Sequence, residues 1–207
     1  MADPKPLPFD QEKLQGISAK AMAIHHDKLY AGYVTKSEEI RLQLRDLGKE
    51  IVAGNAPGGN ATYSLLRGLK DSETFAVNGV YLHEWYFDVL GGAGNTDEAP
   101  ELGKAIAAKW GSLEDAVKYF SECAMAARGW AIVAWDTKSG SLRQYNADAH
   151  NQGGVWGSIP VIVLDCYEHA YFMDFGADKK SYIEAFWKNF NWAKAEELYL
   201  QVRDIKI

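Results

Sequence analysis

The sequence predicts an α+β protein whose first half is helical and whose second half combines helices with a few strands. Two observations lead to this expectation. Apolar residues recur at helical spacing over residues 18–49 and 61–90. Three short apolar or aromatic runs, at 130–135, 142–145 and 159–164, have instead the length of strands.

The first half contains two long predicted helices. Residues 18–49 hold no proline, and the glycine-rich segment 54–60 breaks the chain after them. The second helix, over 61–90, is expected to be interrupted or kinked near residues 78–79. The glycine-rich segment 91–95 ends it.

The second half mixes the two types of element. Helices are predicted at 100–110 and 112–128, and the second of these opens on a capping-box pattern, Ser-Leu-Glu-Asp. Residues 136–140 are short enough to join the first two strands as a hairpin. The run 159–164 is expected to be a third, buried strand, and most of the chain after it is expected to be helical.

The composition is that of an ordinary globular protein, with 47% hydrophobic and 24% charged residues. No apolar run reaches the roughly 18 residues of a membrane span, and the first residues lack the layout of a secretion signal, so we expect a cytoplasmic protein and no membrane partner. The net charge of −6 argues against nucleic acid as a partner. Cys123 and Cys166 form no CxxC motif and are expected to be reduced.

Histidines are the most informative residues. His25 and His83 each lie within a long predicted helix, among apolar and aromatic neighbours. Asp165 and His169 are four residues apart, just after the buried strand. If the chain turns helical at Asp165, the two side chains project to the same side, which suits a metal ion. His26 points about 100° away from His25 on a helix, so we expect it to face solvent or an interface.

Three imidazoles and one carboxylate form a nitrogen and oxygen donor set that suits iron or manganese, and zinc as well. The anionic ligand stabilises a trivalent metal, and the neutral imidazoles keep the divalent state accessible, as a one-electron redox site requires. A non-haem iron oxygenase is an alternative of a different class, although such enzymes use two histidines and one carboxylate.

The segment Asp165-Cys-Tyr-Glu-His-Ala-Tyr171 resembles the D-x-[WY]-E-H-[AS]-Y signature of the iron/manganese superoxide dismutases. The resemblance covers nearly the whole chain, with further matches at Leu7-Pro-Phe9, Ile24-His-His-Asp-Lys28, Asn78-Gly79, Arg128-Gly-Trp130 and Phe186-Trp-Lys-Asn-Phe-Asn-Trp192. It implies a helical-hairpin N-terminal domain, residues 1–93, and a C-terminal α/β domain, residues 94–207, with a small three-stranded antiparallel sheet. The metal is then expected between the two domains.

The same resemblance implies the activity and the metal ligands. The protein is expected to disproportionate superoxide to oxygen and hydrogen peroxide by cycling one iron or manganese ion per subunit between trivalent and divalent states. By motif position the ligands are His25, His83, Asp165 and His169. Members of the family associate, so a homodimer or a dimer of dimers is expected.

Three further residues match functional positions of the family. Tyr33 matches the gateway tyrosine, and Glu168 matches a residue that hydrogen-bonds to a ligand histidine of the partner subunit. Some members carry a glutamine donor four residues before the second ligand, but Gly79 occupies that position here. The segment around His150 resembles the variant in which a histidine of the C-terminal domain is the outer-sphere donor.

The sequence departs from the family at four positions. Leu29 and Phe172 replace a histidine and a tyrosine that bond to each other across the dimer, so we expect an apolar contact in their place. Tyr167 and Ile132 replace tryptophans, and we expect a changed aromatic wall around the metal. A non-catalytic relative that retains the fold therefore also stays open as an alternative.

Superoxide is an anion, so a protein of net negative charge needs a local positive field to attract it. Lys28, Lys36 and Arg143 are the candidate steering residues.

Overall fold

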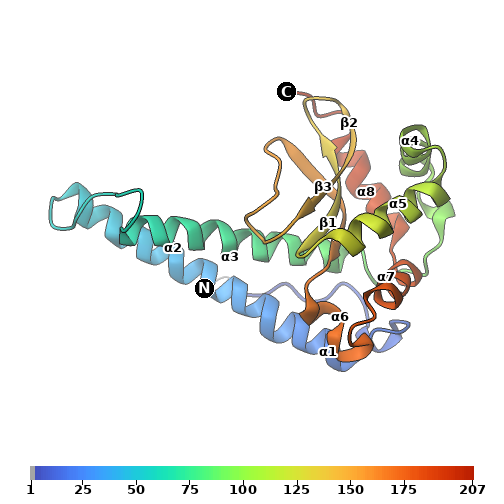
Figure 1. The fold of residues 1–207 in the computed structure, drawn as a ribbon, viewed down its shortest axis with the longest axis horizontal. Coiled ribbons are helices and arrows are strands. Elements are labelled where there is room, and N and C mark those ends of the chain that lie inside the picture. Colours follow the sequence, from blue (N-terminus) through green and yellow to red (C-terminus); the bar gives the residue numbers. More distant parts are fainter. Residues whose placement is uncertain (1–2) are drawn as a thin grey trace.

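The computed structural model describes residues 3–207 and has the predicted α+β architecture. Two long antiparallel helices, α2 (Ala31–Val52) and α3 (Leu65–Asp88), form a hairpin whose outer end extends away from the rest of the molecule (Figure 1). The three-stranded sheet stands against the inner part of α3, and several helices of the C-terminal half pack on its far side (Figure 1). The hairpin and the sheet thus meet at one junction.

The other elements follow in chain order. The helices are α1 (Ala19–Ile24), a π-helix (His25–Tyr30), α4 (Pro100–Trp110), α5 (Leu113–Ala126), α6 (Glu168–Phe175), α7 (Lys179–Lys188) and α8 (Trp192–Val202). The strands are β1 (Trp130–Asp136), β2 (Ser141–Ala147) and β3 (Ser158–Asp165), and short 3-10 turns occur at Gln11–Lys13 and Thr96–Glu98. No helix within residues 3–207 is both long enough and apolar enough to cross a membrane.

The first predicted helix is not one regular α-helix. It begins as expected, because Ser18 caps it by accepting a hydrogen bond from the backbone N–H of Ala21 at 3.1 Å. The backbone then widens to a π-helix over His25–Tyr30 before regular α-helix resumes. Such widened turns are rare and concentrate at functional sites.

The second long helix shows no interruption near Asn78 and Gly79, so the expected kink is wrong. A glycine in a helix interior costs about 1 kcal/mol relative to alanine, but it also permits close packing. A Cβ atom at position 79 would lie 2.8 Å from the ring of Tyr33 on α2. Gly79 therefore serves the contact between two helices, and the backbone of α3 stays regular.

The sheet confirms the predicted antiparallel arrangement, in the order β2-β1-β3. The central strand β1 is almost entirely buried, as its continuous apolar sequence requires. Its register pairs Trp130 with Asp165 on β3 and with Ala147 on β2. Pro160, which cannot donate a ladder hydrogen bond, lies on the edge strand β3 beside a register shift. One hydrophobic core spans both halves of the chain, so the domain division at residue 93 stays a prediction.

Candidate metal centre

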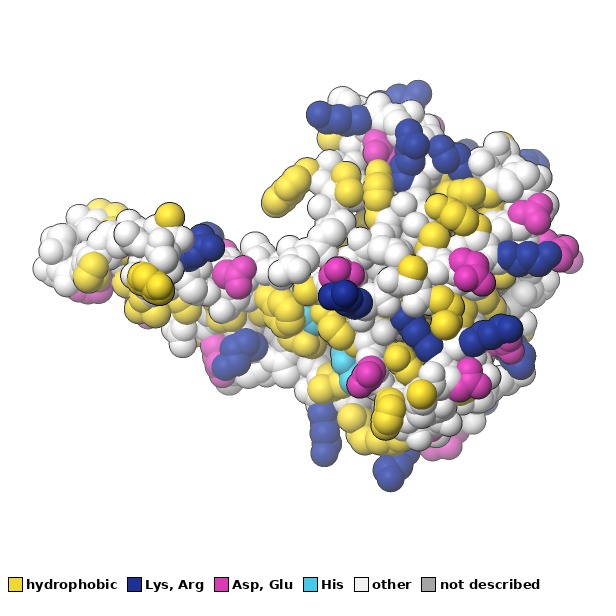
Figure 2. Space-filling model, viewed as in Figure 1, with side chains coloured by type: hydrophobic (Ala, Val, Ile, Leu, Met, Phe, Trp, Pro, Cys, Tyr) yellow, Lys and Arg dark blue, Asp and Glu magenta, His cyan; other side chains and the backbone are white. Residues whose placement is uncertain are grey.

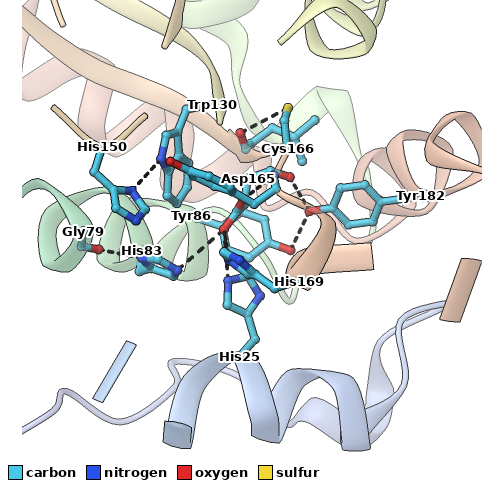
Figure 3. Close-up of polar contacts among 12 residues, drawn as sticks. His25, Gly79, His83, Tyr86, Trp130, His150, Asp165, Cys166, His169 and Tyr182 are labelled. Carbon is cyan, nitrogen blue, oxygen red and sulfur yellow. Dashed lines mark hydrogen bonds and ion pairs between the residues drawn. The ribbon is translucent and has the colours of Figure 1, made fainter. Parts of the chain in front are cut away.

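Four side chains from separate elements converge where the hairpin meets the sheet (Figure 3). His25 is the first residue of the π-helix, His83 lies on α3, Asp165 ends β3, and His169 lies in the first turn of α6. One donor atom from each lies within 4.8 Å of the others. The structure thus brings together the four residues that the sequence predicts as ligands.

The carboxylate of Asp165 lies at the centre of this cluster. Its Oδ2 atom is 3.1 Å from Nε2 of His25, 3.1 Å from Nε2 of His169 and 3.6 Å from Nε2 of His83. Its Oδ1 atom accepts a hydrogen bond from the backbone N–H of Tyr167 at 2.9 Å. One oxygen therefore holds the local backbone, and the other faces three imidazoles.

Asp165 is not helical, so the condition under which it was expected to pair with His169 does not hold. It is the last residue of β3, and α6 begins only at Glu168. The pairing arises because the bond from Tyr167 to Asp165 closes a tight turn between strand and helix. This turn, rather than an i,i+4 helical relationship, places the imidazole beside the carboxylate.

His83 gives the most direct indication that the cluster suits a metal ion. Its Nδ1–H donates to the backbone carbonyl of Gly79 at 2.6 Å, which leaves a lone pair on Nε2. That Nε2 is buried and has no hydrogen-bond partner among residues 3–207. Burial lowers the pKa of His83 to about 3, so the imidazole is neutral at physiological pH. A metal ion would satisfy this buried lone pair.

The charge of the cluster also suits a metal. Burial by itself would raise the pKa of Asp165, but His169 and His25 outweigh it and hold the pKa well below the usual value. In the described part of the chain, the salt-bridge partners of this fully buried carboxylate are histidines, with no Lys or Arg among them. Three imidazole nitrogens and one carboxylate oxygen fit iron or manganese.

Two buried tyrosines support the cluster from behind (Figure 3). The Tyr182 hydroxyl donates to the backbone carbonyl of Asp165 at 2.8 Å and lies 3.1 Å from the Tyr86 hydroxyl. The Tyr86 ring packs against His25, with ring centroids 5.3 Å apart. Sequence pattern does not single out this pair, because it shows only that each tyrosine belongs to the buried face of its own helix.

His150, the expected outer-sphere donor, lies beside the cluster. It is buried after β2, and its ring centroid is 4.8 Å from that of Tyr33 and 5.7 Å from that of His83. Trp130 Nε1–H donates to its Nδ1 at 2.9 Å, so a neutral His150 carries its proton on Nε2. That Nε2 is buried without a partner in the described chain, and burial lowers the pKa of His150 to about 4.

Tyr33 lies between the cluster and an open groove along α2 and α3. Burial raises the pKa of its phenol, so the hydroxyl stays protonated at neutral pH. The groove has a volume of about 600 Å³, and its lining includes Lys28 and Lys36 but not Arg143. Figure 2 shows histidine only as small patches among hydrophobic side chains near the junction, which agrees with a recessed centre.

The remaining predicted residues have mixed outcomes. His26 does not face solvent, since it is only 8% exposed and its Nε2 lies 2.7 Å from the carbonyl oxygen of Lys5. Tyr167 stacks on His169, with ring centroids 5.2 Å apart, and so forms part of the aromatic wall around the cluster. Ile132 is buried in β1, and Glu168 is exposed at the start of α6.

Comparisons with known proteins point to one family. Residues 98–198 match the model of the iron/manganese superoxide dismutase C-terminal domain. The iron superoxide dismutase of Aquifex pyrophilus is 39% identical over 188 residues, which cover 91% of this chain and 86% of that protein. The manganese superoxide dismutase 1 of Halobacterium salinarum is 32% identical over 203 residues, covering 96% of this chain and 95% of that protein.

The packing of Gly79 against Tyr33 predicts opposite effects of alanine at two glycines of α3. Gly79→Ala should lower the free energy of unfolding by about 1–3 kcal/mol, because the added methyl group forces the Tyr33 ring aside. Gly68→Ala, where nothing lies within 4 Å of the new atom, should raise it by roughly 0.5–1 kcal/mol. Urea unfolding of the metal-free proteins measures both. Equal stability changes would contradict the close contact.

Proposed function

This chain belongs to the iron/manganese superoxide dismutase family, and we propose that His25, His83, Asp165 and His169 are the ligands of its one metal ion. The activity of that family is the disproportionation of superoxide to oxygen and hydrogen peroxide. The observation that carries the ligand assignment is the buried Nε2 lone pair of His83, which faces a buried carboxylate and two further imidazoles.

When bound, the metal supplies the redox chemistry, because it alternates between trivalent and divalent states while superoxide is first oxidised and then reduced. The four side chains supply the negative charge and the lone pairs that would bind it. Asp165 supplies one negative charge, and burial keeps His83 neutral, so its lone pair is free to bind a metal. The turn closed by Tyr167 and the bond from His83 to Gly79 hold two of the four in place. Such outer contacts orient ligands and tune the metal.

Formation of hydrogen peroxide consumes two protons, and His150 is placed to present one. Its Nε2–H points into the site without a protein partner, and Trp130 fixes this tautomer from the other side of the ring. A donor on the side chain of residue 79 would have to displace Tyr33, since even a Cβ atom there meets its ring. His150 and Tyr33 together then form the proton-bearing wall that faces the approaching substrate.

The approach of superoxide is aided by local positive charge. Lys28 and Lys36 line the groove that ends at Tyr33, together with Asp71, and Lys36 forms an ion pair with Glu39. Lys28, which forms no ion pair within residues 3–207, is therefore the stronger candidate for attracting the anion. Charges that line a cleft attract an oppositely charged substrate even when the net charge of the protein repels it. Arg143 lies outside this groove, and no contact supports a steering role for it.

A metal-reconstitution experiment tests the ligand assignment. Metal-free protein reloaded separately with iron and manganese should bind one ion per subunit by elemental analysis and dismutate superoxide with at least one of the two metals. His83→Ala should lose the bound metal, since it removes the orphaned lone pair, whereas His150→Gln should retain it. Stoichiometric metal without activity under either loading would instead support a non-catalytic relative.

The role of His150 predicts a loss of rate without a loss of metal. His150→Leu should lower kcat by roughly 10²-fold, within the range usual for loss of a positioned proton donor. Trp130→Phe should have a smaller effect in the same direction, because the proton can then move to Nδ1. Stopped-flow decay of superoxide measures both rates. ¹⁵N NMR of the metal-free wild-type protein should show Nδ1 of His150 unprotonated, and a protonated Nδ1 would exclude this arrangement.

We also propose a dimer formed through α6. Phe172 and Met173 are 57% and 49% exposed on this helix, close to the exposed Glu168 and the partly exposed His169. An apolar surface beside a metal ligand suits a second subunit, against which Glu168 would reach the ligand histidine of the partner. Leu29 is then expected to contact Phe172 of the partner subunit in place of the usual polar bridge.

Sedimentation tests this interface. The wild-type protein should sediment as a dimer or a larger even assembly, and Phe172→Glu should reduce it to a monomer by burying a charge. Leu200→Glu, at an exposed apolar position on α8, is the matched control and should leave the mass unchanged. A Phe172→Glu protein that keeps the wild-type mass would contradict the assignment.

The cytoplasm is the compartment we propose, in keeping with two free thiols, and cell fractionation checks it.

A further inference from the structure

The N-terminal arm, residues 3–17, lies directly beside the two helical segments that carry His25 and His83. Lys5 alone makes three contacts there. Its carbonyl oxygen lies 2.7 Å from Nε2 of His26, and its backbone N–H donates to the Tyr30 hydroxyl at 3.0 Å. Its Nζ forms an ion pair with Glu84.

The residues that hold Lys5 are the chain neighbours of metal ligands. His26 follows His25 in the π-helix, and Glu84 follows His83 on α3. The Tyr30 hydroxyl, which accepts from Lys5, also donates to Oε1 of Glu84 at 2.9 Å. A closed ring of contacts therefore joins the arm, the π-helix and α3 at the level of the metal centre.

The arm contacts matter because the segment they hold is intrinsically weak. A π-helix is rare and seldom extends beyond a single turn, so tertiary contacts must maintain it. His25 is its first residue and Tyr30 its last, and both side chains are buried. If this turn relaxed to regular α-helix, the residues after His25 would rotate relative to it, and the distance between His25 and His83 would change.

The backbone of Lys5 stabilises the π-helix more than its side chain does. The Lys5 side chain is 71% exposed, and exposed ion pairs contribute little. The two backbone contacts end instead on His26 and Tyr30, which are 8% and 1% exposed. Their rings pack on Phe87, with centroids 5.4 and 5.7 Å away, and the ring of His25 packs on the same residue at 5.3 Å.

We propose that the N-terminal arm is a positioning element of the metal centre, in which Lys5, acting through His26, Tyr30 and Glu84, fixes the π-helix against α3 and thereby slows release of the metal. The inference rests on the proposed ligand set. Within residues 3–207, the arm makes no hydrogen bond to a proposed ligand side chain, so its effect is exerted through the orientation of His25 relative to His83.

Metal release from the loaded enzyme tests the proposal. Lys5→Pro removes the backbone N–H that donates to Tyr30, and Tyr30→Phe removes the hydroxyl that joins the arm to Glu84. Each variant should take up one metal ion but release it to a chelator about 10–100-fold faster than wild type, the range seen when outer contacts of metal ligands are removed. The electron paramagnetic resonance spectrum of the loaded protein should also change, because ligand orientation sets its anisotropy.

Matched controls separate positioning from general stability. Lys5→Arg keeps all backbone contacts and should release metal at the wild-type rate. Lys13→Ala removes an exposed lysine elsewhere in the arm, and Tyr81→Phe removes an exposed hydroxyl on α3, so both should behave as wild type. The midpoint of thermal unfolding of the metal-free variants shows whether the fold itself has weakened.

The outcomes distinguish the two proposals. If the wild-type protein binds no metal, the ligand assignment fails and the arm has nothing to position. If the wild-type protein binds metal while Lys5→Pro and Tyr30→Phe release it at the wild-type rate with an unchanged spectrum, the ligand assignment stands and the positioning role is overturned. A lower unfolding midpoint alone, without faster release, overturns it as well.

Discussion

The buried carboxylate of Asp165 is the constraint on which the rest of the site depends. An ionised carboxylate removed from water is costly unless it is paired, and no lysine or arginine pairs with it within residues 3–207. Three imidazoles surround it, and one of them presents an unsatisfied lone pair. A bound metal ion would satisfy both the carboxylate and this lone pair. The cluster that the fold brings together therefore fits a single metal ion.

Two of the four proposed ligands are fixed by a contact that leads away from the centre. The second oxygen of Asp165 closes the turn into α6, and Nδ1 of His83 is held by its own helix backbone. His25 has no equivalent backbone bond in the structure, and it begins the least regular turn of the chain. The arm contacts at His26 and Tyr30 act on that turn. The N-terminal arm therefore supports the proposed ligand that begins this irregular turn.

Much of this arrangement could be predicted from sequence, and the remainder shows where pattern reasoning stops. Helices α4 and α5 and the three strands follow from local sequence patterns. The four proposed ligands follow from a family resemblance that extends over nearly the whole chain. The π-helix could not be predicted, because its extra backbone width is not visible in the hydrophobic spacing. His26 was expected to face solvent because a helical wheel ignores the arm that covers it. An interruption was expected at Asn78 and Gly79 because glycine weakens a helix. Gly79 instead accommodates the ring of Tyr33, and this contact could not be foreseen because Tyr33 lies 46 residues earlier in the chain.

The glycine at position 79 links the fold to the chemistry. Because the Tyr33 ring fills the space beside it, no side chain at position 79 can extend into the site without displacing that ring, and a proton donor must come from another position. The loop after β2 supplies His150, and Asn151 secures that loop to α3 through Thr74 at 3.1 Å. Trp130, whose backbone pairs with Asp165 in the sheet, then fixes the tautomer of His150. The same strand register that places Asp165 therefore also places the tryptophan that orients His150, the proposed proton donor.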